Sequence, residues 1–147
     1  MKIPTKHQKR PKAAASPTSR SIQLLKQLGY TVEVVERWNS FARIRHDLFG
    51  IGDLLAFTPK IRGTLMIQAT SGPNHNARVV KIKNSPITLP WLIARNRLQI
   101  HSWGGYPLGK RRITCFFLTL DNTLGMREID LPNQDLEYPG NDDMDIT

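Results

Sequence analysis

Polar residues stand at two defined places in the stretch 47–72, at the start of one apolar run and at the end of the next. Asp53 opens the run DLLAFT, and Gln68 and Thr70 lie at the end of the run GTLMIQAT. Carboxylate and amide oxygens are ligands that a hard divalent cation such as Mg²⁺ accepts. If the two runs are paired strands, this spacing predicts a cation site shared between them.

The segment PKIR, between the two apolar runs, predicts that they form an antiparallel hairpin. If Thr58 faces Gly63 across the turn, the register places Asp53 opposite Gln68. Directly opposed residues project from the same face of a sheet, with Cβ atoms roughly 5 Å apart. Asp53, the amide oxygen of Gln68 and the backbone carbonyl of Ala69 are therefore the predicted metal ligands.

A glutamine ligand brings no negative charge, so the site needs further carboxylates. Between residues 13 and 120 the chain has fifteen Lys and Arg but only four carboxylates, all within twenty-one residues. The four are Glu33, Glu36, Asp47 and Asp53. Glu36 or Asp47 could complete the metal shell, directly or through water. The alternative for each is an ordinary surface carboxylate paired with a nearby arginine.

The elements that would position these residues follow the order α-β-β-β-α-β-β. Apolar spacing and turn residues predict a helix over 18–28, a strand over 30–37, a loop or irregular strand over 39–52, the hairpin, a helix over 73–84, a short helix from Pro90, and strands over 97–103 and 112–120. Apolar runs without polar alternation are typical of strands buried on both faces. The predicted fold class is α/β, with a central mixed β-sheet flanked by helices.

Several short motifs occur in this same order: VERW, RHDLFGIGDLLAF, LMIQATSG, NARVVKI and IHSWGG. Together they resemble the PD-(D/E)XK, or restriction-endonuclease-like, nuclease superfamily, in particular Holliday junction resolvases and small phage and bacterial VRR-NUC-type nucleases. The resemblance covers about residues 19–105. Asp53 matches the motif aspartate, and Gln68, Ala69 and Thr70 occupy the (D/E)XK position.

The resemblance implies a restriction-endonuclease-like core and a Mg²⁺-dependent DNA endonuclease, with Mn²⁺ as a substitute. Such an enzyme hydrolyses phosphodiester bonds, here in junction or flap DNA during recombination, repair or phage replication. By the resemblance, Asp53 and Gln68 would hold the metal. With Glu36 and Asp47 as the nearby carboxylates and Lys81 as a cation from the following helix, these are the candidate catalytic residues. Paired cuts in DNA would favour a homodimer.

Two positions depart from the superfamily pattern, since Gln68 replaces an acid and Thr70 replaces a lysine. A lysine in this role only has to bring its ammonium group to the site, so the following helix could supply it. Lys81 is the predicted replacement, or Arg78 on the same side of that helix. If neither reaches the site, the chain would be a catalytically inactive DNA-binding protein.

The 147-residue chain has a net charge of +9 and a pI of about 10.1, which favours an anionic partner. Its charge distribution predicts a flexible basic arm (1–17), one nuclease-like domain (18–125) and an acidic C-terminal tail (126–147). The expected partner is duplex or branched DNA, and the alternative is a basic RNA- or ribosome-associated protein. The predicted DNA-binding residues are Lys9, Arg10, Arg43, Arg45, Arg78, Lys110, Arg111 and Arg112.

No apolar run reaches the length of a membrane span, and the first residues lack a signal-peptide core. These features predict a protein of the cytoplasm, in a bacterial or phage-infected cell, without a membrane partner. The single cysteine, Cys115, lies in an apolar run and is expected to be a buried strand residue. His46, His75 and His101 are expected to be solvated or in contact with phosphate rather than catalytic.

Overall fold

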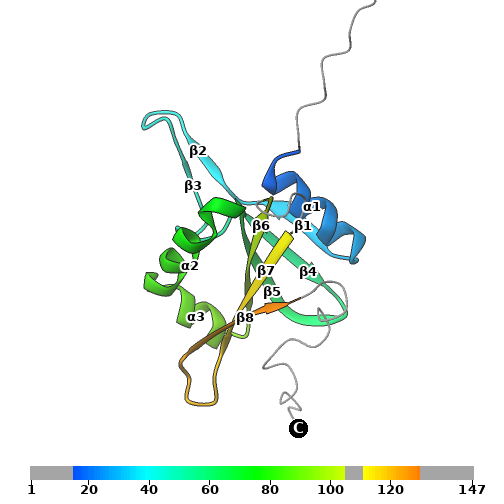
Figure 1. Cartoon of the computed structure of the whole chain (residues 1–147), viewed down its shortest axis with the longest axis vertical. Helices are drawn as coiled ribbons and strands as arrows, with labels where there is room; N and C mark the ends of the chain where they lie inside the picture. Colours follow the sequence, from blue (N-terminus) through cyan, green and yellow to red (C-terminus); the bar gives the residue numbers. More distant parts are fainter. Residues whose placement is uncertain (1–14, 105–110, 130–147) are drawn as a thin grey trace, which may run out of the picture.

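A six-stranded mixed sheet forms the centre of the computed structural model, which describes residues 15–104 and 111–129 (Figure 1). The strand order is β1-β4-β5-β6-β7-β8, in which only β5 and β6 are parallel. The bounds are Thr31–Val34 for β1, Leu54–Thr58 for β4, Ile61–Ser71 for β5, Arg97–Trp103 for β6, Arg111–Leu118 for β7 and Leu124–Ile129 for β8. The α/β class and the mixed sheet predicted from the sequence are confirmed.

Helices cover both faces of this sheet. Helix α1 (Pro17–Gln27) packs on one face, while α2 (His75–Asn84), after the short 3₁₀ turn Gly72–Asn74, and α3 (Thr88–Ile93) pack on the other. Successive side chains of β5 point to opposite faces of the sheet, so this strand contacts the helices on both sides. Leu65 and Ile67 face α1, whereas Met66 faces α2 and α3. By the same alternation, Gln68 lies on the α2 side.

The β4–β5 hairpin has the register that brings Asp53 beside Gln68, although its turn differs from the prediction. Leu54 pairs with Ile67, and the Asp53 N–H donates to the Ile67 carbonyl at 2.9 Å. The expected pairing of Thr58 with Gly63 was wrong, because Thr58 pairs with Ile61 around a tighter turn. An irregularity between residues 56 and 58 absorbs this offset, as β-bulges do.

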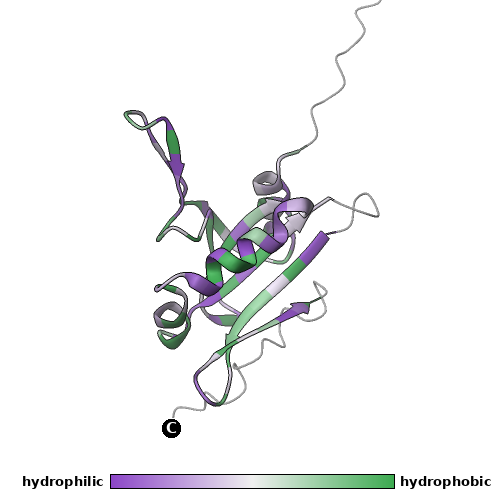
Figure 2. Cartoon of the chain, turned by 60° about the vertical axis from the view of Figure 1, so that its left-hand side comes forward, coloured by the Kyte–Doolittle hydropathy of each residue, from purple (hydrophilic) through white to green (hydrophobic). Residues whose placement is uncertain are grey.

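Residues 37–46 form a second, separate sheet of two strands, β2 (Arg37–Asn39) and β3 (Ile44–His46). The sequence predicted one strand over 30–37 followed by a loop or irregular strand. The structure corrects both predictions, because β1 ends at Val34 and the residues that follow form a hairpin. The Asn39 side-chain oxygen accepts the N–H groups of Phe41 at 3.0 Å and Ala42 at 3.1 Å, which closes the turn. This projecting hairpin stands away from the main sheet in both overall views (Figures 1 and 2).

The sheet also extends into the segment assigned to the acidic tail. Strand β8 pairs with β7 along its whole length and buries Ile129. Residues 126–129 therefore belong to the folded domain, and the predicted boundary at 125 was wrong. The remainder of that tail, residues 1–14 of the basic arm and residues 105–110 lie outside the described residues. Among the helices that are described, none combines the length and the apolar character needed to span a membrane.

Candidate metal centre

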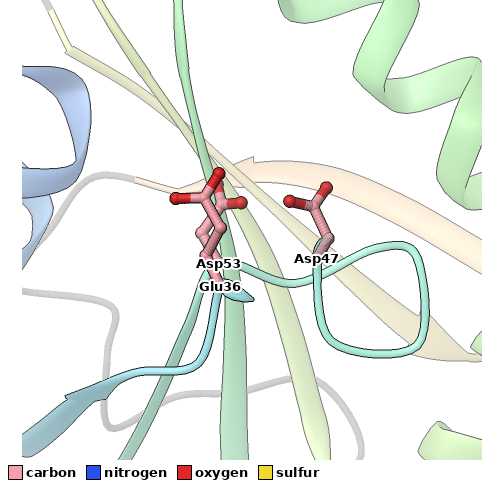
Figure 3. Close-up of side chains that lie close together, drawn as sticks. All are labelled: Glu36, Asp47 and Asp53. Carbon is pink, nitrogen blue, oxygen red and sulfur yellow. The ribbon is translucent and has the colours of Figure 1, made fainter. Parts of the chain in front are cut away.

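Three carboxylates from three segments of the chain converge beside the start of β4. Glu36 lies between β1 and β2, Asp47 follows β3, and Asp53 immediately precedes β4. One ligand oxygen from each lies within 4.8 Å of the other two, and Figure 3 shows the three side chains gathered together. The structure thus brings together the three carboxylates that the sequence singled out as candidate ligands.

Strand β5 holds Asp53 in place. The Gln68 amide donates from Nε2 to Asp53 Oδ2 at 2.7 Å, and the Ala69 backbone N–H donates to the same oxygen at 2.9 Å. Gln68 is only 2% exposed, and its Oε1 has no hydrogen-bond partner within the described parts of the chain. A buried polar atom without a partner is costly, so the Gln68 side chain uses its nitrogen on Asp53 and leaves its oxygen able to accept another group.

Ala69 meets Asp53 through its N–H, so the predicted role of its carbonyl as a metal ligand stays a prediction. Thr70, at the position where the superfamily pattern has lysine, is 5% exposed. Its hydroxyl cannot supply the positive charge of an ammonium group. Any positive charge at the centre must therefore come from another element.

Lys81 brings a positive charge to this centre from α2. Its Nζ lies 2.8 Å from Asp47 Oδ2, and the side chain is 37% exposed while that of Asp47 is 13% exposed. Arg78, three residues earlier on the same helix, also acts on the charge of Asp47. The sequence placed both cations on one side of this helix, and the structure brings both into the electrostatic range of the cluster.

The surroundings shift the pKa values of Asp53 and Asp47 in opposite directions. Burial, followed by the hydrogen bond and charge of Asp47, raises the pKa of Asp53 to about 7, against a smaller opposing effect of the Ala69 N–H. Burial also tends to raise the pKa of Asp47, but hydrogen bonds from Asp53 and Lys81 and the charges of Lys81 and Arg78 lower it below its usual value. Near neutral pH, Asp53 is therefore present both with and without its proton, while Asp47 is ionised.

Helix α2 is fixed to the sheet by a buried histidine at its first residue. His75 lies 2.6 Å through Nδ1 from Ser102 Oγ and 3.5 Å through Nε2 from Thr114 Oγ1. Burial, together with the charge of Arg112, lowers the pKa of His75. The expectation of a solvated or phosphate-contacting histidine was wrong here, because the topology places the start of α2 directly over β6 and β7.

His101 is also buried, on the opposite face of the sheet. It lies 3.0 Å through Nδ1 from Ser21 Oγ and 2.9 Å through Nε2 from Gln99 Oε1. Complete burial lowers the pKa of His101 to about 3, so the ring is neutral. His101 is therefore part of the packing of α1 and was wrongly expected at the surface, whereas His46 is exposed. Cys115 is buried in β7, as predicted.

Apart from Arg78, which lies on α2, the predicted DNA-binding residues fall into three groups. Arg43 and Arg45 are exposed on the projecting hairpin, and Arg45 Nη1 lies 3.7 Å from Glu36 Oε2. Arg111 and Arg112 are exposed on β7, where Arg112 forms an ion pair with Glu128. The remaining three, Lys9, Arg10 and Lys110, lie outside the described residues.

Sequence reasoning missed the hairpin that links two of the carboxylates. The segment RWNSFARIRH lacks the apolar alternation that predicts a half-buried strand, because both of its strands are exposed to solvent. The available signal was Asn39, which can close a turn through its side chain. Two short β-prone segments flanking that turn would have suggested the pairing.

The donor set fits a hard divalent cation. Three carboxylates and an amide oxygen offer only oxygen ligands, which Mg²⁺ and Mn²⁺ prefer over softer metals. In the structure the Gln68 amide turns Nε2 toward Asp53, so Gln68 Oε1 acts as a ligand at the cluster only after the amide flips and gives up this hydrogen bond.

The raised pKa of Asp53 leads to a stability prediction for Asp53→Asn. In the wild type the folded pKa of about 7 lies above the unfolded value of about 3.9. Stability associated with protonated Asp53 is therefore present at acidic pH and is lost as the pH rises from about 4 to 7, at roughly 1.4 kcal/mol per pH unit. The variant stays neutral, so without metal we expect its melting temperature to exceed that of the wild type at pH 8.

Thermal melting at pH 4.5 and pH 8 with EDTA checks this expectation. The difference between the two proteins should nearly vanish at pH 4.5, where both side chains are neutral. Added Mg²⁺ should raise the melting temperature of the wild type at pH 8 and have little effect on the variant. An equal difference at both pH values would show that Asp53 does not titrate between them.

Comparison with known proteins gives no relative from which a role could be carried over. No model of a known protein family, no curated protein and no solved structure matches the chain.

Proposed function

We propose that this protein is a Mg²⁺-dependent deoxyribonuclease with a restriction-endonuclease-like core, which hydrolyses phosphodiester bonds of duplex or branched DNA. The observation that carries the proposal is the cluster of Glu36, Asp47 and Asp53. Within it, Asp53 is hydrogen-bonded to the buried Gln68, whose amide oxygen has no partner among the described residues. A general structural role would not require three carboxylates to crowd together at a common point, because their mutual repulsion destabilises the fold.

The residues that would hold the metal are Asp53, Gln68, and Glu36 or Asp47. When bound, the ion would activate water and neutralise charge that develops on the phosphate. The chain itself contributes the positioning. Strand β5 orients Asp53 through the Gln68 amide and the Ala69 N–H, which both donate to its Oδ2.

Lys81 supports the proposal because it places an ammonium group where Thr70 has none. The side chain is partly exposed, so it can meet a phosphate from solvent while it stays bonded to Asp47. Arg78 adds a second positive charge on the same side of α2. Both cations would attract the phosphate toward a cluster that is otherwise negative.

A cleavage panel tests the proposal directly. Labelled duplex, single-stranded, flap and four-way-junction DNA, with structured RNA as a further substrate, would be incubated with Mg²⁺, Mn²⁺ or EDTA. We expect metal-dependent cleavage of at least one DNA substrate and none of the RNA. Absence of cleavage with either metal, at protein concentrations that saturate DNA, would contradict the proposal.

The second candidate is a catalytically inactive protein of the same fold that binds DNA. It is favoured by the ion pair between Lys81 and Asp47, since an ammonium group can neutralise the cluster in place of a metal. This alternative predicts that Mn²⁺ binds no more tightly to the wild type than to Asp53→Ala in calorimetric titration. The nuclease proposal predicts that only the wild type binds at the cluster.

Gln68 gives a further prediction. If its Oε1 is a ligand, Gln68→Glu adds a negative charge to the shell and should tighten Mn²⁺ binding, whereas Gln68→Ala should weaken it by about 10- to 100-fold, as loss of supporting groups at metal sites does. Calorimetric titration of each variant with Mn²⁺ measures both changes. Equal metal affinities in the wild type and both variants would exclude Gln68 from the shell.

A further inference from the structure

The projecting hairpin, residues 37–46, begins and ends at candidate metal ligands. Glu36 immediately precedes β2, and Asp47 immediately follows β3. The hairpin pairs only with itself and extends away from the main sheet (Figures 1 and 2). Because an isolated two-stranded hairpin is only marginally stable in water, a partner that binds the hairpin would also help to order Glu36 and Asp47.

The side chains of the hairpin have the chemistry of a nucleic-acid surface. Three large apolar side chains are exposed, with Trp38 at 61%, Phe41 at 101% and Ile44 at 49%. The basic or titratable side chains are Arg37, Arg43, Arg45 and His46, and the segment contains no acid. Exposed aromatics beside arginines are typical of surfaces that hold nucleic-acid strands. A second copy of the hairpin would instead bring like charges together.

Register places an aromatic and a cation on the face that leads to the carboxylates. Trp38 pairs with Arg45, so both side chains project from the same side of the hairpin. Arg45 in turn contacts Glu36, which belongs to the cluster. This face is therefore continuous with the candidate metal centre. Phe41 stands fully exposed in the turn at the far end.

We propose that the hairpin binds unpaired nucleotides of DNA adjacent to the phosphate at the metal centre, with a base stacked on Trp38, a phosphate on Arg45, and Phe41 against the end of the neighbouring duplex. The proposal rests on the proposed function and assigns its substrate class, which is branched or partly single-stranded DNA. The reason is geometric, because bases inside a duplex have both faces covered by their neighbours and offer nothing for an exposed indole to stack on.

The test measures binding alone, in EDTA, by fluorescence anisotropy. The probes are a labelled duplex and the same duplex with a single-stranded flap, in which 2-aminopurine replaces the first unpaired adenine. We expect the wild type to prefer the flap and to quench the 2-aminopurine. Trp38→Ala and Phe41→Ala should each weaken flap binding about 5- to 150-fold, as loss of base stacking does, with little change on duplex.

Two matched variants control for general effects of aromatic removal. Trp38→Phe keeps an aromatic face and should retain most of the preference and of the quenching. Phe57→Ala removes an aromatic side chain that is 54% exposed on β4, outside the hairpin, and should change neither the flap preference nor the quenching of 2-aminopurine. Arg45→Ala should weaken binding to both probes and reduce the salt dependence of binding by about one phosphate contact. Arg62 is an exposed cation on β5, and Arg62→Ala should change neither the affinity nor the salt dependence.

Several outcomes would overturn this inference. Equal affinities for duplex and flap in the wild type would do so, and so would unchanged flap binding in both Trp38→Ala and Phe41→Ala. A change of sedimentation from dimer to monomer in these variants, without a change in DNA preference, would assign the hairpin to contacts between copies. None of these measurements requires cleavage, so the two proposals can fail separately. A protein that prefers the flap but cuts no DNA would refute the proposed nuclease function and support the hairpin inference. A nuclease without the flap preference would support the proposed function and refute the hairpin inference.

Discussion

Asp53→Ala will cut no DNA substrate at a measurable rate while it binds DNA nearly as well as the wild type does. The substitution removes the carboxylate that β5 orients through Gln68 and Ala69, which is the most buried carboxylate of the cluster. Because metal stabilisation of a phosphoryl transition state amounts to several kcal/mol, we expect turnover to fall by more than about 10³-fold. DNA affinity depends on arginines and lysines elsewhere and should change little.

Single-turnover cleavage at saturating protein, with anisotropy for binding, measures the two effects separately. Glu33→Ala is the matched control, since Glu33 is an exposed carboxylate on β1 outside the cluster. Asp53→Asn provides a second variant that keeps an oxygen acceptor for the Ala69 N–H, in case the alanine variant unfolds. Wild-type turnover in Asp53→Asn would remove Asp53 from the metal site.

Lys81→Ala will lower turnover about 10²- to 10³-fold, within the range seen when a charge-stabilising donor is removed from an active site. The side chain supplies the ammonium that Thr70 lacks, and it holds Asp47 at 2.8 Å. DNA affinity should fall only slightly, because the lost interaction is made mainly in the transition state. Lys83→Ala, an exposed lysine two residues further along α2, should leave turnover unchanged.

Lys81→Arg distinguishes two roles for this lysine. A guanidinium keeps the ion pair with Asp47 but lacks the compact geometry of an ammonium group. If Lys81 only holds Asp47, the arginine variant should keep full activity; if the ammonium itself acts on the phosphate, activity should fall several-fold at unchanged DNA affinity. Normal cleavage by Lys81→Ala at saturating DNA would exclude both roles.

The sequence by itself determined the local arrangement around Asp53 and Gln68. Strand alternation and the register of a short hairpin are local properties, so the side chains at the start of one strand and the end of the next could be placed on the same face. The turn was predicted wrongly, yet the pairing of Leu54 with Ile67 keeps Asp53 beside Gln68. The face that a residue occupies depends on register over the body of the strands, and an irregularity near the turn does not change it.

Charge scarcity also singled out Glu36 and Asp47 as candidate ligands, although it could not show that they meet. Their approach depends on the projecting hairpin, whose strands are exposed on both sides and therefore lack the apolar pattern that predicts a strand. Only the pairing of β2 with β3 returns the chain so that residues eleven apart in sequence, Glu36 and Asp47, lie side by side.

Tertiary structure decided that Lys81, one of the two cations that the sequence offered, contacts Asp47, and it decided which histidines are buried. Lys81 contacts Asp47 across thirty-four residues because α2 packs on β5 and β6, and His75 is buried because it begins that helix directly over Ser102 and Thr114. Such contacts between distant segments depend on how the helix and sheet layers pack against each other, so they cannot be predicted from the composition of either segment. The sequence therefore determines the types and faces of the candidate ligands, whereas the packing of α2 on the sheet and the pairing of β2 with β3 determine that they lie together.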